Sequence, residues 1–527
     1  FLTLLILIFQ RSDTYTSSYY IGTTMSGVLQ FFYEAGQRYY DLSPFSDECY
    51  PQGDPPAADL IIDYNNCNLP FVLVNHGTLV VLIIIISILL REFKLIEKIL
   101  YWIPESVIVL LLGLIVGFLT KAARAPPRWI SITQAWVKFG FLPPIILSSA
   151  YQLYDKNFFN QFFSILLLAI IGTVTAINGI TLSLKANNSL ELAGGALKNA
   201  SMWDYYKFGT TVSSVDPITV LSIFNTANVD KSLYFLVFGE SAFNDGVAYA
   251  LFKGFKMVDD WTILKSNQTG EQAEVSTETY VYLSFSFIVG PILSVLFAFI
   301  VVFVSSLLTK IMTRRSQIFS PFLVLGCVWT GFYISDFIGL SPIIFALICG
   351  LGQMRYTFPN LPPAHQLTIR LVLNTIATVY QLCIFLFLGV LVSFIDIAAY
   401  WQLILLTTFI MYVWRCVVIM GMGLYINKFT KSKIHWKWQI ILCVGSLRGI
   451  MAIAMSKEND GEETVFQDIC LALIFVTVLI NGIAIKPLVI ILGLQAVENK
   501  LPEDVNNVEE EEVPTKNKWL SLIHISE

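Results

Sequence analysis

Long apolar stretches, separated by short polar segments, run from residue 71 to residue 493. They number about thirteen, and about 20 apolar residues at 1.5 Å each are enough to cross the hydrocarbon core of a bilayer. They span about residues 71–90, 104–120, 130–150, 160–184, 205–226, 233–254, 281–309, 318–336, 339–353, 371–394, 398–427, 438–456 and 467–493, although 318–353 also allows a different division. The pattern predicts an all-α polytopic membrane protein with about thirteen transmembrane helices.

The same pattern divides the chain into four parts. Residues 1–70 are expected to be an apolar stub followed by a polar extracellular or lumenal segment, and residues 71–493 to be the transmembrane domain. Phe rather than Met at position 1 predicts a truncated N-terminus. Residues 494–519 turn polar and acidic, as the start of a cytosolic regulatory tail would. Residues 520–527 resemble the translation of a sequencing-library adapter, so we interpret them as an assembly artefact that follows a truncated tail.

The composition narrows the class of function. Of the 527 residues, 55% are hydrophobic and only 13% are charged, whereas soluble domains carry about 25% charged residues. The net charge of −5 and the lack of a basic stripe argue against nucleic-acid binding. The sequence contains no CxxC or HExxH motif, its four histidines are scattered, and no nucleophile–base pair stands out. We therefore expect no enzyme, no catalytic residues and no cofactor.

The charges of the loops orient the helices. If residues 10–70 lie outside, most lysines and arginines fall in inside loops, and the outside loop 457–468 is acidic, in agreement with the positive-inside rule. Only the basic loop after residue 120 disagrees. The three Asn-X-Ser/Thr acceptors, at Asn187, Asn199 and Asn267, all fall in predicted outside loops. We expect a glycosylated protein with a cytoplasmic C-terminus.

Two of the apolar stretches are interrupted in corresponding ways. In the fifth, Asp216 precedes Pro217, which removes an amide donor and disfavours helix at the residue before it. In the twelfth, Gly445 and Gly449 flank Arg448. If the seventh stretch is a linker, the interrupted stretches are equivalent members of two inverted repeats, which is typical of the substrate site of a secondary transporter. The alternative is a pair of Pro and Gly kinks with no transport role.

Two carboxylates lie in the apolar run 233–252, although a charge at the centre of a membrane helix costs about 2.5–3.5 kcal/mol. Asp245 can hold either a proton or a small hard cation, which makes the two compete, and Asn244 adds a side-chain oxygen. Asp216 is either a further ligand or a cap on the broken helix. These residues predict an ion-binding site.

Glu240 precedes Asp245 by five residues, so it is rotated by about 140° around the helix and need not share the site. We expect it to form a structural ion pair with a buried arginine, and both Arg415 and Arg448 are candidates.

Several motifs then resemble one family. FGESAFND at 238–245 is similar to the FGES-x-x-ND signature of sodium/proton exchangers (NHE type) in the monovalent cation:proton antiporter family. Similar stretches follow the family order: FLPPIIL at 141–147, VDPITVL at 215–221, LFLGV at 386–390, INKF at 426–429, SLRG at 446–449 and IKPL at 485–488. Together they cover about residues 71–493.

The resemblance implies about thirteen spans in two inverted six-helix repeats, with crossing discontinuous helices, and a homodimer. It implies electroneutral exchange of one external Na+ (or Li+) for one internal proton by alternating access, which regulates intracellular pH and sodium. Asn244 and Asp245 would bind the ion, with Asp216 nearby. Glu240 would pair with Arg415, and Arg448 would offset helix-end charge. Na+, H+ and the lipid bilayer are then the expected partners, together with regulators that bind the tail.

Three positions depart from the family pattern: Gln381 and Ser148 stand where acids are usual, and Gly246 where Ala is usual. Gln381 bears on cation affinity or inhibitor sensitivity rather than on exchange itself. The stretch at 426–429 favours the plasma membrane, which we expect, whereas 223–230 is similar to endomembrane members. The alternatives are a K+(Na+)/H+ exchanger of an endomembrane compartment and a transport-inactive homologue.

Overall fold

The structure is a computed structural model that describes residues 103–122, 136–189, 200–216, 220, 221, 223, 224, 227, 229–269, 285–312, 317–395, 397–430, 433–458 and 464–495. These residues form helices joined by turns, and the only β contact among them is an isolated bridge between Val229 and Gln495. Six of their helices are long and apolar enough to cross a membrane. The all-α membrane protein predicted from the sequence is therefore confirmed for this part of the chain. The predicted segment 1–70 and residues 496–527 lie outside it.

The N-terminal half of the bundle consists of α6 (Glu105–Ala122), η2 (Trp136–Phe141), α7 (Leu142–Leu153), α8 (Lys156–Leu167), η3 (Leu168–Gly172), α9 (Thr173–Ser189), α10 (Met202–Ser213) and α12 (Lys231–Thr269). Capping residues mark where two of these helices begin. Asp155 caps α8 by accepting a hydrogen bond from the Asn157 amide at 2.8 Å, and Ser201 and Asp204 form a capping box at the start of α10.

The C-terminal half consists of η4 (Phe285–Val289), α14 (Gly290–Ile311), η5 (Gln317–Phe319), α15 (Ser320–Phe337), α16 (Pro342–Tyr356), η6 (Phe358–Asn360), α17 (Pro363–Phe394), α18 (Ile397–Phe429), α19 (Trp436–Val444), α20 (Ile450–Lys457) and α21 (Thr464–Ile491). Pro at the first helical positions of α14, α15, α16 and α17 fits the start of a helix, where its missing amide would lack a partner in any case.

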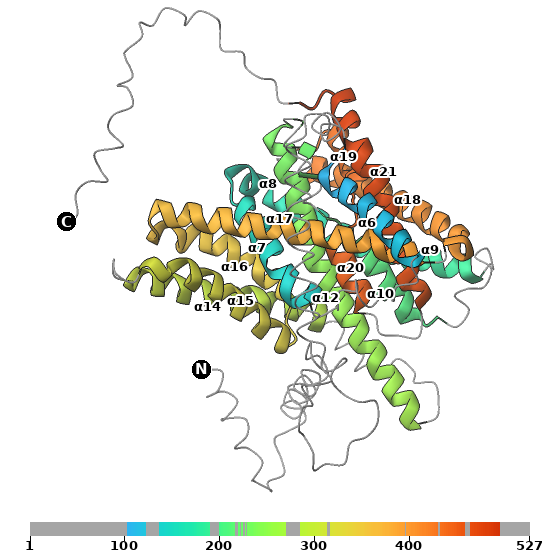
Figure 1. Ribbon diagram of the computed structural model, residues 1–527, viewed down its shortest axis with the longest axis horizontal. Coiled ribbons are helices and arrows are strands. Elements are labelled where there is room, and N and C mark those ends of the chain that lie inside the picture. The colour runs from blue at the N-terminus through green and yellow to red at the C-terminus, as the bar shows by residue number, and fades with distance from the viewer. Residues whose placement is uncertain are drawn as a thin grey trace, which may run out of the picture.

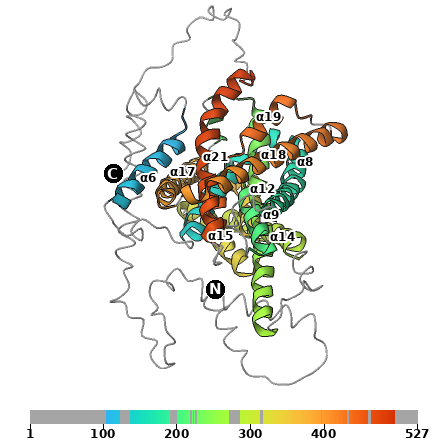
Figure 2. The same ribbon diagram turned by 90° about the vertical axis from the view of Figure 1, so that its right-hand side faces the viewer.

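The helices pack in two groups. We call η2, α7, α14, α15 and α16 the α16 group, because each packs on α16 or on α7, which itself packs on α16. We call α8, α9, α10, α12, α18, α19, α20 and α21 the α12 group. The α16 group lies on the left of Figure 1 and most of the α12 group on the right, while α17 runs between them and packs along α6. Figure 2, turned by 90°, shows α18 and α19 in the upper part of the bundle, with α21 running down through its middle.

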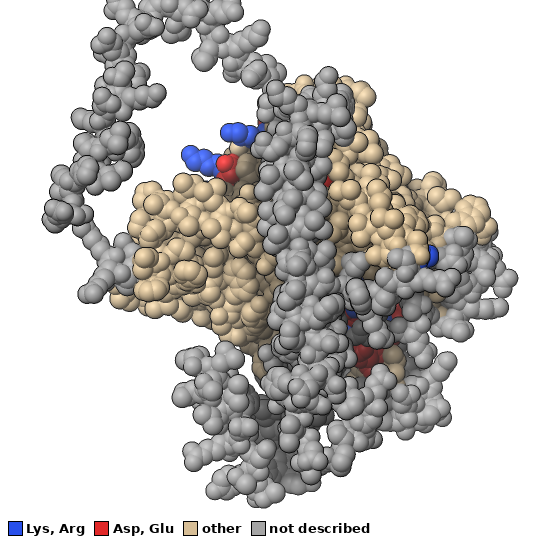
Figure 3. Space-filling view, viewed as in Figure 1, with Lys and Arg blue, Asp and Glu red and all other residues tan. Residues whose placement is uncertain are grey.

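The outer surface of α14 is apolar. It exposes large side chains at Ile292, Phe299, Phe303 and Ile311, each more than half exposed. The left side of Figure 3, where α14, α16 and α17 lie, is almost free of charged side chains. A surface of this kind fits contact with lipid tails, because in a bilayer the outside of a helix bundle needs no polar groups.

The helices α6 and α17 approach each other closely at two glycines. A Cβ atom at Gly113 would lie 2.1 Å from the carbonyl oxygen of Leu386, and one at Gly389 would lie 2.2 Å from the carbonyl oxygen of Leu110. Small residues let membrane helices pack backbone to backbone, which replaces the hydrophobic effect that drives association in water.

We expect Gly389→Ala to lower the stability of the protein by about 1–3 kcal/mol, the usual cost of overpacking, because the backbone of Leu110 cannot rotate away from the added methyl group. Thermal unfolding of the detergent-solubilised protein would measure the change. Gly421→Ala on α18 is the matched control, since its Cβ position has no neighbour within 4 Å in the described part of the chain, apart from the backbone of its own helix. Equal midpoints for Gly389→Ala and the wild type would contradict the expectation.

Two of the glycosylation candidates lie in helices and not in loops. Asn187 is in the last turn of α9, where its side-chain amide donates to the carbonyl oxygen of Ser183 at 2.8 Å, and Asn267 is within α12. The prediction that both lie in loops is wrong, because polar residues continue these helices beyond the apolar stretches. Asn199 lies outside the described residues. Glycosylation itself stays a prediction.

Candidate ion-binding site

Two interrupted helices meet at the centre of the bundle. The helix α10 ends at Ser213, and residues 214–216 continue without helical structure. The helix α19 ends at Val444, and residues 445–449 separate it from α20. The two non-helical segments touch, because the Asp216 amide donates to the carbonyl oxygen of Leu447 at 2.7 Å.

The contact between the segments depends on a glycine. A Cβ atom at Gly449 would lie 2.3 Å from Cβ and 2.4 Å from Oδ2 of Asp216, so any larger residue would displace the buried Asp216 side chain. Gly445, at the other end of the same segment, donates its amide to the carbonyl oxygen of Ile441 and so closes α19. Pro217, the predicted cause of the break after α10, lies outside the described residues.

Asp245, on α12, faces the first of these segments. Its Oδ1 atom accepts hydrogen bonds from the Ser214 hydroxyl at 2.9 Å and from the Val215 amide at 3.2 Å. Asp245 and Asp216 both line a pocket. The other lining residues come from α7, α12, α16 and α20: Leu142, Ile145, Ile146, Ser149, Ala242, Ile343, Leu347, Ile450 and Met451. The pocket therefore lies at the boundary between the α16 group and the α12 group.

Two further oxygens on α12 lack hydrogen bonds. Oδ1 of Asn244 and Oγ of Ser241 are buried, and neither has a hydrogen-bond partner within the described part of the chain. A buried oxygen without a partner costs about 1–3 kcal/mol, so such an atom in a native structure requires an explanation. Both residues are within one helical turn of Asp245. Asn244 is predicted from the sequence but Ser241 is not, although its spacing of four residues before Asp245 places it on the same face of the helix.

Glu240 forms a bidentate ion pair with Arg415, at 2.8 Å and 2.9 Å. Arg415 also donates to the carbonyl oxygen of Leu442 at 3.4 Å, in the last turn of α19. The structure thus places Arg415, and not Arg448, beside Glu240. The pair joins α12 to α18 and leaves neither charge unbalanced in the interior.

Arg448 lies at the carboxyl end of α10, the other interrupted helix. Its Nη1 atom donates to the carbonyl oxygens of Ser213 and Ser214, both at 2.8 Å, and it is 2% exposed. The carboxyl end of a helix carries about half a negative charge, which a buried cation offsets. Arg448 therefore offsets the negative charge at the carboxyl end of α10, as Arg415 does at the carboxyl end of α19.

None of the three positions that depart from the family pattern lines the pocket. Ser148 donates to Oδ1 of Asn374 on α17 at 3.4 Å, while its neighbour Ser149 is the lining residue. Gln381 is buried on α17. A Cβ atom at Gly246 would lie 2.9 Å from the side chain of Ile344, so this glycine gives close packing of α12 on α16.

Comparison with known proteins agrees with this arrangement. The chain matches the family model described as sodium/hydrogen exchanger, transmembrane, over residues 79–491. It is 28% identical to sodium/hydrogen exchanger 3 of Oryctolagus cuniculus over 432 residues, covering 80% of this chain and 50% of that protein. It is also 28% identical to sodium/hydrogen exchanger 5 of Mus musculus over 456 residues, covering 84% and 48%. The chain thus spans about half the length of the curated relatives it matches.

Among solved structures, the sodium proton antiporter MjNhaP1 from Methanocaldococcus jannaschii has a similar fold, with a TM-score of 0.59 at 17% identity over 81% of this chain and 99% of that one. At this level of identity the likeness shows a shared fold. The family match covers most of this chain, including both interrupted helices and α12. The chain belongs to the sodium/hydrogen exchanger family.

Proposed function

We propose that the protein is a secondary antiporter that exchanges Na+ for H+ across a membrane. The observation that carries the proposal is the position of Asp245, beside the crossing of two interrupted helices and in a pocket between two helix groups. Discontinuous helices that meet at mid-membrane commonly form the substrate site of a secondary transporter. Membership of the family and the names of the relatives support Na+ and H+ as the ions.

Oxygen atoms supply the chemistry of the site. The free oxygen of the Asp245 carboxylate, Oδ1 of Asn244 and Oγ of Ser241 are hard ligands, which suit a hard cation better than a soft metal. Asp216 lines the same pocket. We assign the cation to this set, so that binding satisfies the two buried oxygens that have no hydrogen-bond partner among the described residues.

Proton and cation compete for one carboxylate in this proposal. Asp245 carries a negative charge when it is empty, and either Na+ or H+ makes it neutral. Asp216 lines the same pocket, and two further buried charges near the site are compensated, because Glu240 pairs with Arg415 and Arg448 faces helix-end carbonyls. The site then has the same charge when it carries Na+ in one direction and H+ in the other. This supports electroneutral one-for-one exchange.

Alternating access would come from movement between the two helix groups. The pocket lies where the α16 group faces the α12 group, so a relative shift of the groups would open it to one side and then to the other. We extend this to the full architecture: about thirteen spans, with α10 and α19–α20 as equivalent members of two inverted repeats. We propose a homodimer, a cytosolic tail from residue 494, and location in the plasma membrane.

Proteoliposomes with a trapped pH dye would test the function. We expect an inward pulse of Na+ or Li+ to drive proton efflux, and a valinomycin clamp of the voltage to leave the rate unchanged. K+ as effective as Na+ would favour the alternative exchanger of an endomembrane compartment. Absence of flux with every cation would contradict the proposal and leave a transport-inactive homologue.

A further inference from the structure

A second set of buried charges lies outside the ion pocket and contains none of the residues to which ion binding is assigned above. Nζ of Lys138 is 3.1 Å from Oδ2 of Asp336 and 3.4 Å from Oε1 of Glu458. Nζ of Lys253 is 2.5 Å from Oδ1 of Asp336. Lys138 and Glu458 are buried, and the Asp336 side chain is 10% exposed. We call these four residues the charge network.

The charge network joins the two helix groups. Lys138 lies on η2 and Asp336 on α15, both in the α16 group, whereas Lys253 lies on α12 and Glu458 caps the carboxyl end of α20, both in the α12 group. Lys253 reaches Asp336 and Lys138 reaches Glu458, so each of these two ion pairs crosses the boundary between the groups. Lys256 holds Glu458 in place by donating to its backbone oxygen.

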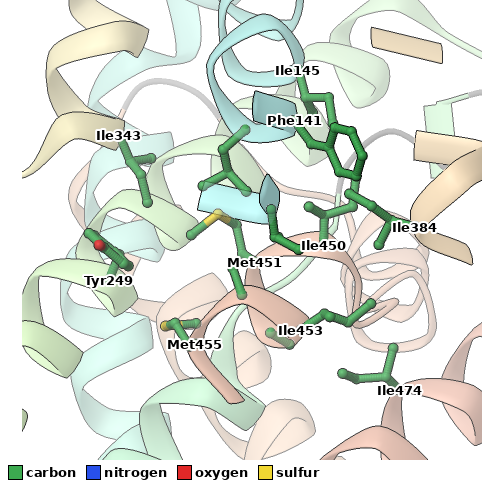
Figure 4. Packing of buried hydrophobic residues seen from close by; sticks show 14 of the residues in the cluster. Phe141, Ile145, Tyr249, Ile343, Ile384, Ile450, Met451, Ile453, Met455 and Ile474 are labelled. Atoms are coloured by element: carbon green, nitrogen blue, oxygen red, sulfur yellow. The ribbon is translucent and has the colours of Figure 1, made fainter. Parts of the chain in front are cut away.

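The charge network closes one end of the route to the pocket. Lys253 follows Asp245 by eight residues on α12, which places it about 12 Å along the helix axis. Tyr249 lies between them on α12, and it is buried in one packed cluster with Ile343 and Met451, which line the pocket (Figure 4). The Tyr249 hydroxyl is 3.4 Å from Oε2 of Glu458, so the cluster and the network are continuous. On this side, buried side chains and then the charge network therefore cover the pocket.

The positive-inside rule places this end outside, because the acidic segment 457–468 includes Glu458 itself. The network is electrically balanced, with two lysines and two carboxylates. A buried ion pair gains Coulomb energy but loses hydration, and the two nearly cancel. Separating the pairs into water therefore costs little, whereas removing one partner leaves a buried charge without compensation. Such a contact holds a boundary closed and still allows it to open.

We propose that the charge network is an outer gate, which holds the outside route to the Asp245 pocket closed and separates when the α12 group moves against the α16 group. The proposal rests on the alternating access proposed above. It assigns Lys138, Lys253, Asp336 and Glu458 a role in the conformational equilibrium and none in ion binding.

A cysteine reporter behind the gate tests the proposal. Met451→Cys places a thiol at the pocket lining, behind the charge network. A membrane-impermeant methanethiosulfonate reagent is added outside intact cells, and the rate measured without the reporter is subtracted for the native cysteines. We expect Asp336→Asn and Lys138→Gln each to speed labelling about tenfold, which corresponds to about 1.4 kcal/mol in the opening equilibrium.

The matched control is Asp259→Asn. Asp259 forms an equally close ion pair with buried Lys207, at 2.5 Å, but both residues lie in the α12 group, and Lys207 keeps a second partner in Asp204 at 2.8 Å. Unchanged labelling in both network variants would overturn the gate. An equal increase in Asp259→Asn would also overturn it, since that result indicates general loosening.

A further outcome is that neither network variant accumulates in the membrane whereas Asp259→Asn does. This would contradict the gate proposal and show that the network has a purely structural role. Labelling requires no transport, so the two proposals fail separately. Sodium-driven proton flux by the unmodified protein tests exchange alone. Accelerated labelling without flux would keep the gate and remove the exchange.

Discussion

Asp245→Asn is expected to reduce sodium-driven proton flux to the background of empty liposomes. Asparagine has almost the same shape, and its oxygen can still accept hydrogen bonds from the Ser214 hydroxyl and the Val215 amide. The variant therefore keeps the local contacts but loses the carboxylate to which the proposal assigns the exchange of a proton for a cation. The measurement is the proteoliposome assay, with thermal unfolding of the same preparation as the test of folding.

Asp259→Asn is the matched control for this prediction. Asp259 is a buried carboxylate on the same helix, but it pairs with Lys207 and does not line the pocket. We expect this variant to exchange at close to the wild-type rate. Normal exchange by Asp245→Asn would remove Asp245 from the ion site, and an equal loss in both variants would show that any buried carboxylate of α12 is needed.

Arg415→Gln is expected to have the largest effect on stability, about 3–5 kcal/mol, because it leaves the Glu240 carboxylate buried without a counter-charge. It also removes the hydrogen bonds to the carbonyl oxygen of Leu442 at the end of α19. The expected result is a protein with a much lower unfolding midpoint in detergent and little accumulation in the membrane.

The double variant Glu240→Gln/Arg415→Gln separates the ion pair from its surroundings. If the cost of Arg415→Gln comes from the uncompensated carboxylate, neutralising Glu240 as well recovers much of the lost stability. A double variant that is as unstable as the sum of the two single variants would show that the residues act independently. In that case the contact with α19 would explain the effect of Arg415.

The apolar stretches and the two interruptions could be predicted from the sequence because their causes are local. A run of about 20 apolar residues needs no knowledge of its neighbours to be recognised as a membrane span, and the glycines of residues 445–449 weaken a helix wherever it packs. The motif at 238–245 likewise placed Asn244 and Asp245 on one helix. The helix limits were less predictable, and α12 continues to Thr269 because polar residues outside the membrane extend it.

The partners of the buried charges could not be read from the sequence. Glu240 had two candidate arginines, and only the tertiary placement of α18, which packs on α9, α19 and α21, brings Arg415 to it across 175 residues. The charge network is less predictable still, since Lys138 and Glu458 are 320 residues apart and no pattern connects them. Apolar periodicity reports which face of a helix is buried, but it carries no information about which helix lies opposite. Which ion pairs form, and which buried oxygens lack a partner, depends on the helix that lies opposite. Only the tertiary structure therefore assigns them.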